Sequence, residues 1–200
     1  MTFEELKSEL LPLLKTNKVF GFFISGGLDS AVLLYICSLI REQENLPSRF
    51  KIVTVPRHDD SSVHSARIVK WINQRFNINL TTSTVGNPNL HHSEQVASGI
   101  EIMWYSLDHL VFGDTMNPPH LLNGPERATY NSNDQKIIRP FMNAYKDNTV
   151  RLAIELGLTE LMEITHTCTE SKTLRCNVCW QCTERAWAFG VNRYVDPGTM

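Results

Sequence analysis

The feature that most constrains the fold is an apolar run at residues 19–24 that ends in adjacent glycines and is followed by a second apolar run at residues 31–40. The first run is aromatic and β-branched, which predicts a buried strand, and the second is typical of a buried helix. Between them stands Ser-Gly-Gly-Leu-Asp-Ser, at 25–30. A strand that turns through glycine into a helix directs backbone N–H groups and the positive end of the helix dipole at one spot, where anions bind.

The residue types in this turn suit a phosphate. Glycine allows the backbone to approach phosphate oxygens closely, and serine hydroxyls can donate hydrogen bonds to them. The carboxylate of Asp29 would repel phosphate, and a Mg²⁺ ion between the two removes that repulsion. The spacing matches neither a Walker loop nor a dinucleotide-binding motif. The alternative is a structural turn with Asp29 as helix N-cap. We expect a phosphate group to be bound by Ser25, Gly26, Gly27, Leu28, Asp29 and Ser30.

The alternation of strand and helix continues along the chain. Strands are expected at 19–24, 51–55, 79–85, 109–113 and 161–165, and helices at 3–14, 31–40, 63–76, 93–107 and around 150–156. This order predicts an α/β fold with a parallel sheet and helices on both faces. The stretch 114–133, rich in proline, glycine and asparagine, is expected to be a long loop, either a functional lid or a surface insertion.

Four of the five cysteines crowd together near the C-terminus with the spacing C-x7-C-x2-C-x2-C. Four thiolates match a tetrahedral structural zinc, with no open position for catalysis. An iron-sulfur cluster and a pair of disulfides are the alternatives. Cys37 lies apart and is expected to be a small buried hydrophobic residue. The expected zinc ligands are Cys168, Cys176, Cys179 and Cys182.

Charge and hydropathy restrict the partners. Nineteen basic residues against 21 acidic ones give a formal net charge of -2, so nucleic acid is an unlikely main partner. The apolar run 31–40 is about half the length that a membrane helix needs, and the first residues lack the basic and apolar regions of a secretory signal. We expect a cytoplasmic protein with no membrane contact.

The glycine turn, in its setting between strand and helix, resembles the PP-loop of the N-type ATP pyrophosphatases. Together with the cysteine cluster it is similar to the 7-cyano-7-deazaguanine synthase family, called QueC, of the queuosine pathway. Further residues that match this family's pattern are Arg139-Pro140-Phe141, Lys146, Leu156-Gly157-Leu158, Thr167-Cys168, Cys179-Trp180-Gln181-Cys182, Arg185, Ala188 and Phe189.

The resemblance implies a Rossmann-like fold of the adenine nucleotide alpha hydrolase type at 1–165, with the zinc-binding segment 166–200 packed on it. It implies an ATP-dependent ligase that adenylates a heterocyclic carboxylate, 7-carboxy-7-deazaguanine. Ammonia then gives an amide, and a second activation gives the nitrile. Asp29, Ser30 and Lys146 are the expected catalytic residues, and a homodimer is implied by the family alone.

Two segments depart from the family pattern. The usual Tyr-Gly-Gln-Arg-His keeps only Arg57 and His58, and Asp114 lies in the segment that replaces Gly-Tyr-Pro-Asp-Cys. These three residues are the substrate-binding candidates. The alternatives are a PP-loop enzyme with another substrate, such as a tRNA thiolase or one acting on a different carboxylate, and a non-catalytic zinc module that binds nucleic acid. The basic face of such a module would consist of Lys172, Arg175 and Arg185.

Overall fold

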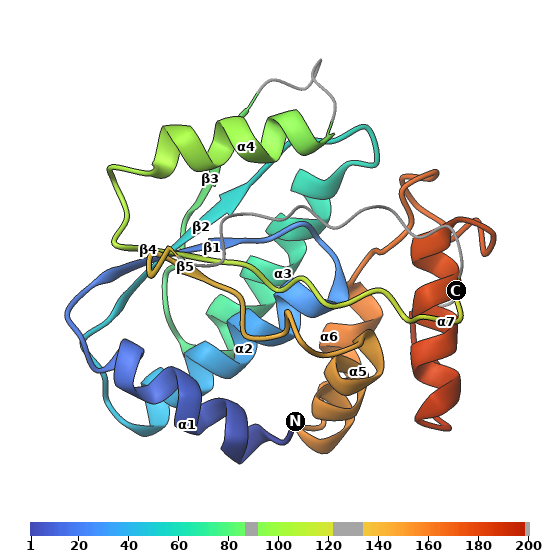
Figure 1. The fold of residues 1–200 in the computed structure, drawn as a ribbon, viewed down its shortest axis with the longest axis horizontal. Coiled ribbons are helices and arrows are strands. Elements are labelled where there is room, and N and C mark those ends of the chain that lie inside the picture. The colour runs from blue at the N-terminus through green and yellow to red at the C-terminus, as the bar shows by residue number, and fades with distance from the viewer. Residues whose placement is uncertain (87–91, 122–133, 199–200) are drawn as a thin grey trace.

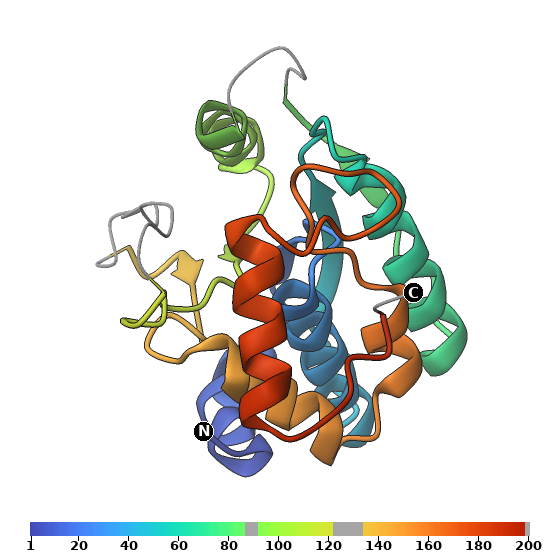
Figure 2. The ribbon, with the colours of Figure 1, turned by 90° about the vertical axis from the view of Figure 1, so that its right-hand side faces the viewer.

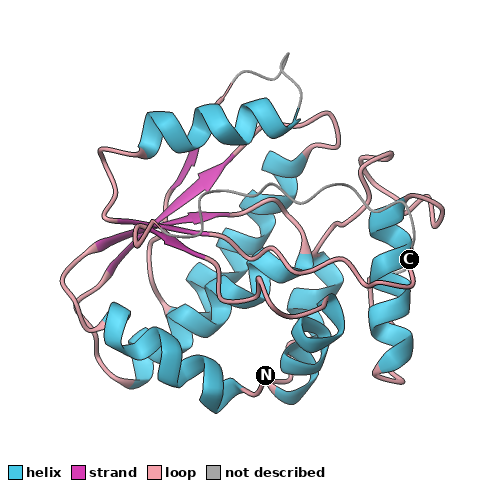
Figure 3. Ribbon diagram, in the orientation of Figure 1, coloured by secondary structure: helices cyan, strands magenta, loops and turns pink. Residues whose placement is uncertain are grey.

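In the computed structural model, which describes residues 1–86, 92–121 and 134–198, the core is a twisted parallel sheet (Figure 3). All strand pairs within it are parallel, and the spatial order is β3-β2-β1-β4-β5. The chain therefore places β2 and β3 on one side of β1, and then β4 and β5 on its other side. The strand order changes direction between β1 and β4. The strands are β1 Val19–Phe23, β2 Arg49–Thr54, β3 Thr82–Thr84, β4 His109–Val111 and β5 Ile137–Ile138.

Helices cover both faces of the sheet (Figure 1). One face carries α4, and the other helices lie on the opposite side, where α7 stands farther from the sheet and packs against α5. The helices are α1 Phe3–Leu14, α2 Leu28–Gln43, α3 Ser61–Phe76, α4 His92–Met103, α5 Lys146–Glu155, α6 Thr159–Ile164 and α7 Trp180–Val191.

Alternate strand residues supply two hydrophobic cores, as the two-residue period of a strand requires. On β1, Phe20 and Phe22 join the larger core beneath α2. Phe23 and Val53 of β2 join the smaller core, which also contains Leu107 from the segment that follows α4. The sheet is thus buried on both faces, and its carboxyl edge remains available for a site.

Most of the expected elements are present, within a few residues of the expected bounds. The expected strand at 161–165 is wrong, because residues 159–164 form α6. Leu161 and Met162 are fully buried, while Glu160 and Glu163 are exposed, so this short apolar run follows a helical turn. β5 and α7 were not expected. Residues 114–121 contain no helix or strand, and the rest of the expected loop, 122–133, lies outside the described residues.

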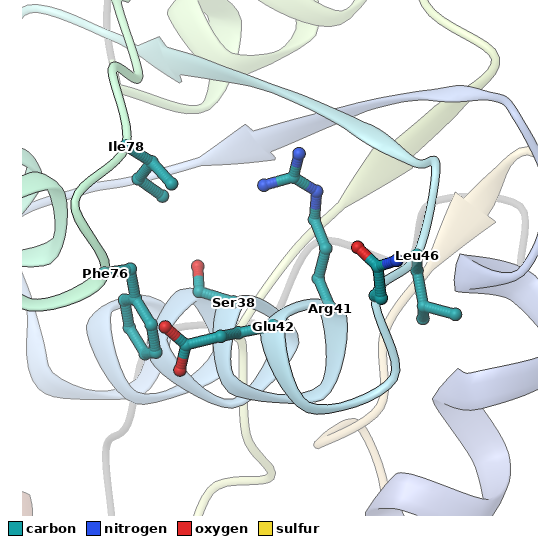
Figure 4. Close-up of a pocket in the computed structure, with 7 residues that line it drawn as sticks. Ser38, Arg41, Glu42, Leu46, Phe76 and Ile78 are labelled. Carbon is teal, nitrogen blue, oxygen red and sulfur yellow. The ribbon is translucent and has the colours of Figure 1, made fainter.

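A small cavity of about 200 Å³ opens at the carboxyl end of α2 (Figure 4). Ser38, Arg41, Glu42 and Phe76 are among the residues that line it. The length of α2 places this cavity roughly 20 Å from the glycine turn, so it is separate from the site described below. No helix in the described ranges combines the length and the apolar character needed to cross a membrane.

Candidate functional site

The glycine turn lies where β1 passes into α2, at the carboxyl edge of the sheet. Because the strand order changes direction between β1 and β4, this edge has the crevice in which open α/β sheets bind ligands. Gly26 has φ +85°, a conformation that favours glycine. Gly27 is the N-cap of α2, so Asp29 lies in the first turn and is not the N-cap. The sequence prediction of a strand, glycine turn and helix is confirmed.

Both serine hydroxyls of the turn lie within hydrogen-bonding distance of Gly27. Gly27 N–H is 3.4 Å from Ser25 Oγ, and Ser30 Oγ donates to Gly27 O at 3.3 Å. Ser25 is exposed, whereas Ser30 is buried. Ser25 thus places an exposed hydroxyl on a glycine turn at a helix N-terminus, a position at which anions bind. Phosphate binding by this turn stays a prediction.

Gly113, which follows β4, packs directly against the start of α2. A β-carbon at this position would lie 2.7 Å from both Cα and N of Ser30 and 2.8 Å from the carbonyl carbon of Asp29. These are backbone atoms in a helix, so they cannot move aside as a flexible side chain would. The end of β4 therefore holds the first turn of α2 in place.

We expect Gly113→Ala to lower the free energy of unfolding by about 1–3 kcal/mol through overpacking. Gly190→Ala is the matched control, because no atom of the described part of the chain lies within 4 Å of its β-carbon position in α7. Replacing this helical glycine should stabilise the protein by roughly 0.5–1 kcal/mol. Urea denaturation measures both changes, and equal stabilities for the two variants would contradict the close contact.

Lys146 joins the turn to two other elements. It is the first residue of α5 and is 5% exposed, and its ammonium is held by two carboxylates. Lys146 Nζ lies 2.5 Å from Asp29 Oδ2 and 3.0 Å from Glu184 Oε2. Glu184, on α7, is 1% exposed and was not singled out from the sequence. Lys146, Asp29 and Glu184 thus form a cluster of one cation and two carboxylates at the N-terminus of α2.

The three substrate candidates occupy different settings. Asp114 lies beside Gly113 at the carboxyl edge and forms an ion pair with Arg139, which follows β5. Arg57 pairs with the buried Asp59, and burial lowers the pKa of Arg57 to about 10. His58 is exposed and contacts the carbonyl oxygen of Thr169 at 2.7 Å. The structure thus places Asp114 beside the glycine turn, while Arg57 and His58 contact other parts of the chain.

The four clustered cysteines converge in space. Their Sγ atoms all lie within 4.8 Å of one another, in the arrangement of a metal site, and none forms a disulfide. Cys168 and Cys182 are buried, and Cys176 and Cys179 are half-buried. The structure therefore does not support the alternative of a pair of disulfides. Cys37 is buried elsewhere, as expected, and burial raises the pKa of its thiol.

The local backbone favours the thiolate form at one of these cysteines. Asn177 has φ +60°, which turns the chain so that Cys179 N–H donates to Cys176 Sγ at 3.2 Å. The N–H groups of Val178 and Cys179 lower the pKa of Cys176 to about 7, whereas burial raises the pKa of Cys182. Thiolate is the form that binds metal.

The structure contradicts the basic face suggested for a nucleic-acid-binding module. Arg185 is fully buried and contacts Asp196 at 2.7 Å, the hydroxyl of Thr165 at 2.7 Å and the carbonyl of Met162 at 2.9 Å. The side chain of Arg175 is 6% exposed and pairs with the same Asp196. Among the three cations, only Lys172 faces solvent. The two arginines fasten α7 and the segment after it to the rest of the protein.

The family model described as "Queuosine biosynthesis protein QueC" matches residues 58–193, more than half of the chain. The chain belongs to the QueC family. The match includes Lys146, Glu184 and the four clustered cysteines, and it begins after the glycine turn. The QueC resemblance read from the sequence is therefore confirmed. The glycine turn lies outside the matched residues, and the structure connects it to them through the contact of Asp29 with Lys146.

A curated relative is 7-cyano-7-deazaguanine synthase 2 from Colwellia psychrerythraea (strain 34H). It is 30% identical over 102 residues, which cover 48% of this chain and 45% of that protein. The aligned part thus spans less than half of the curated relative.

Two solved structures share the fold. U34-tRNA thiolase NcsA from Methanococcus maripaludis, determined with its [4Fe-4S] cluster, has a TM-score of 0.54 at 16% identity, covering 95% of this chain and 72% of that one. NAD⁺ synthetase from Burkholderia pseudomallei has a TM-score of 0.50 at 16% identity, covering 78% of this chain and 66% of that one. At this identity, the similarity establishes a Rossmann-like fold for this QueC family member.

Proposed function

We propose that this protein is an ATP-dependent ligase that adenylates a heterocyclic carboxylate and then aminates it, as a 7-cyano-7-deazaguanine synthase does. The observation that carries the proposal is the contact between Asp29 of the glycine turn and Lys146, at the switch point of the sheet. Of these two residues, Lys146 lies within the part of the chain that the QueC family model matches. The proposed substrates are ATP, 7-carboxy-7-deazaguanine and ammonia, and the product is the amide, the nitrile or both.

In this proposal, residues 25–30 bind the polyphosphate of ATP through backbone N–H groups and the hydroxyls of Ser25 and Ser30. Lys146 supplies a positive charge where negative charge develops as pyrophosphate leaves. Glu184 keeps the Lys146 ammonium at the turn, because its carboxylate lies 3.0 Å away. Asp114, beside Gly113, is placed to contact the substrate heterocycle.

The residues at the turn fit a magnesium ion. Asp29 Oδ1 is a buried carboxylate oxygen that has no hydrogen-bond partner among the residues that the structure describes, while Oδ2 binds Lys146. Oxygen ligands from carboxylate and phosphate are those that Mg²⁺ prefers. Asp29 would hold the ion, which when bound offsets the repulsion between carboxylate and phosphate.

The cysteine cluster supports a structural zinc ion. Zinc–sulfur bonds of about 2.3 Å place tetrahedral ligand sulfurs about 3.8 Å apart, which agrees with Sγ atoms within 4.8 Å of one another. In a [4Fe-4S] cluster each cysteine binds a different iron, so the sulfurs stand farther apart. We propose zinc, held by Cys168, Cys176, Cys179 and Cys182, in a segment 166–200 that packs on the domain at 1–165.

A direct assay tests the proposed function. The protein is incubated with ATP, Mg²⁺, 7-carboxy-7-deazaguanine and ammonium, and the mixture is analysed by mass spectrometry. We expect AMP, pyrophosphate and the mass of the amide or nitrile, all dependent on the heterocycle. AMP formation with another carboxylate, and none with this one, would reassign the substrate while keeping the chemistry.

A tRNA thiolase is the second candidate, because U34-tRNA thiolase NcsA shares the fold of this chain. The two candidates predict different colours and metal contents for the purified protein. A ligase of the proposed type is colourless and contains one zinc per chain, whereas a thiolase that uses an iron-sulfur cluster is brown and absorbs visible light. Metal analysis of protein purified without oxygen distinguishes them.

We further propose that the protein is cytoplasmic and forms a homodimer. Light scattering of the purified protein measures the number of subunits.

A further inference from the structure

Three histidines contact the main chain of the segment 169–172, which follows the first cysteine of the metal site. The Nε2 atom of each lies within hydrogen-bonding distance of a main-chain carbonyl oxygen: His58 at 2.7 Å from Thr169, His166 at 2.7 Å from Ser171 and His64 at 2.9 Å from Lys172. A carbonyl oxygen only accepts, so each Nε2 is a donor. The segment is thereby held against the start of α3 (Figure 2).

Two of these histidines also support the glycine turn. The backbone N–H of His166 donates to the carbonyl oxygen of Gly26 at 2.9 Å. The rings of His64 and His166 are stacked, with centroids 4.2 Å apart and planes 12° apart. A β-carbon at Gly26 would lie 2.6 Å from Cβ of His64. Gly26 therefore packs against Cβ of His64 and is hydrogen-bonded to the backbone of His166.

The segment 169–172 is part of the loop between the first two metal ligands, Cys168 and Cys176. A metal bound by both cysteines closes this loop and reduces its freedom. The carbonyl groups that His64 and His166 contact are then held in place. The two stacked histidine rings are held with them, because their Nε2 atoms donate to these carbonyl groups. The contacts form one continuous path from the cysteines to the phosphate-binding turn.

We propose that the stacked pair His64 and His166 couples the two sites, so that a metal ion at the cysteines and a nucleotide at residues 25–30 each raise the protein's affinity for the other. The inference rests on the proposed function, since it takes the turn as the nucleotide site. Both histidines are positioning residues, which act on the ligand through Gly26. Linkage requires the coupling to be equal in both directions.

The test measures zinc affinity by equilibrium competition with a chromogenic chelator, with and without saturating Mg²⁺ and α,β-methylene-ATP. In the wild-type protein the nucleotide should raise zinc affinity about tenfold, a coupling of ordinary size for two linked sites. Calorimetry should then show nucleotide affinity falling by the same factor when zinc is removed. Zinc affinity that stays constant while nucleotide binds would overturn the proposal.

Substitutions of the pair sharpen the test. His64→Leu and His166→Leu remove the Nε2 donors, and we expect the coupling factor to fall to about one while zinc is still bound. Glu160→Ala is the matched control, because it removes another link of α3 to the C-terminal part, the 3.1 Å bond from Trp71 Nε1, and should keep the full factor. Leucine variants with the wild-type factor would contradict the role of the pair.

Two amide variants, His64→Gln and His64→Asn, test the proposal if the leucine variants do not fold. The amide of His64→Gln can donate from near the position of Nε2, whereas that of His64→Asn is too short to do so. We expect glutamine to retain coupling and asparagine to lose it, and equal factors would overturn the proposal. Zinc-loaded wild-type protein that binds no nucleotide would refute the proposed function and the coupling together. Nucleotide binding without coupling would refute the coupling alone.

Discussion

Replacing Asp29 with alanine should lower the rate of pyrophosphate release by about 10²–10³-fold, the usual cost of removing one electrostatic contact to a transition state. The carboxylate has an oxygen available for a cation and another that holds Lys146 at 2.5 Å, so its loss affects both positive charges near the phosphates. The fold should survive, because Lys146 keeps Glu184 at 3.0 Å and is not left as an unpaired buried charge.

A pyrophosphate-coupled assay measures this rate, and circular dichroism checks the fold. Asp147→Asn is the matched control, since Asp147 is also an acidic residue in the first turn of a helix and follows Lys146 directly. It should keep nearly the full rate. An Asp29→Ala enzyme with wild-type turnover would remove the glycine turn from the reaction.

Replacing Cys179 with serine should cost both the metal and the stability of the C-terminal segment. Serine is a poor zinc ligand, and metal binding at such a site is coupled to folding. Cys179 is also the N-cap of α7, so the metal site that the substitution removes lies at the start of that helix. We expect a loss of about 3 kcal/mol or more, which corresponds to a melting temperature lower by roughly 10 °C for a protein of this size.

Cys37→Ala is the matched control for this variant. Cys37 is buried in the main core, away from the cluster, and should keep one zinc per chain with a loss of about 1 kcal/mol from the small cavity. Metal analysis and thermal melting measure both effects. A Cys179→Ser protein that is free of metal and as stable as the wild type would show that the site does not stabilise the fold.

The sequence predicted the parts of the molecule whose local pattern and final environment agree. The β1 strand is apolar because both faces of the sheet are covered, and Gly26 is glycine because its φ is +85°. The four cysteines are close in sequence as well as in space. Local signals of this kind do not depend on distant partners, so they were predicted from the sequence.

The missed features depend on partners far apart in the chain. α7 has no continuous apolar stripe, because Glu184 and Arg185 point inward, and they are buried only because Lys146 and Asp196 pair with them. β5 has two residues and is defined by its pairing with β4. His64 and His166 come together only after α3 and α6 are in place, and each alone is an ordinary histidine in the sequence.

A crystal structure of the protein with Mg²⁺ and α,β-methylene-ATP tests the central claim most directly. We predict the triphosphate on the backbone N–H groups of residues 25–30, with the α-phosphate near Lys146 and the ion on Asp29. Electron density for the nucleotide at another place, or a glycine turn filled by side chains of the chain itself when the analogue is saturating, would contradict it.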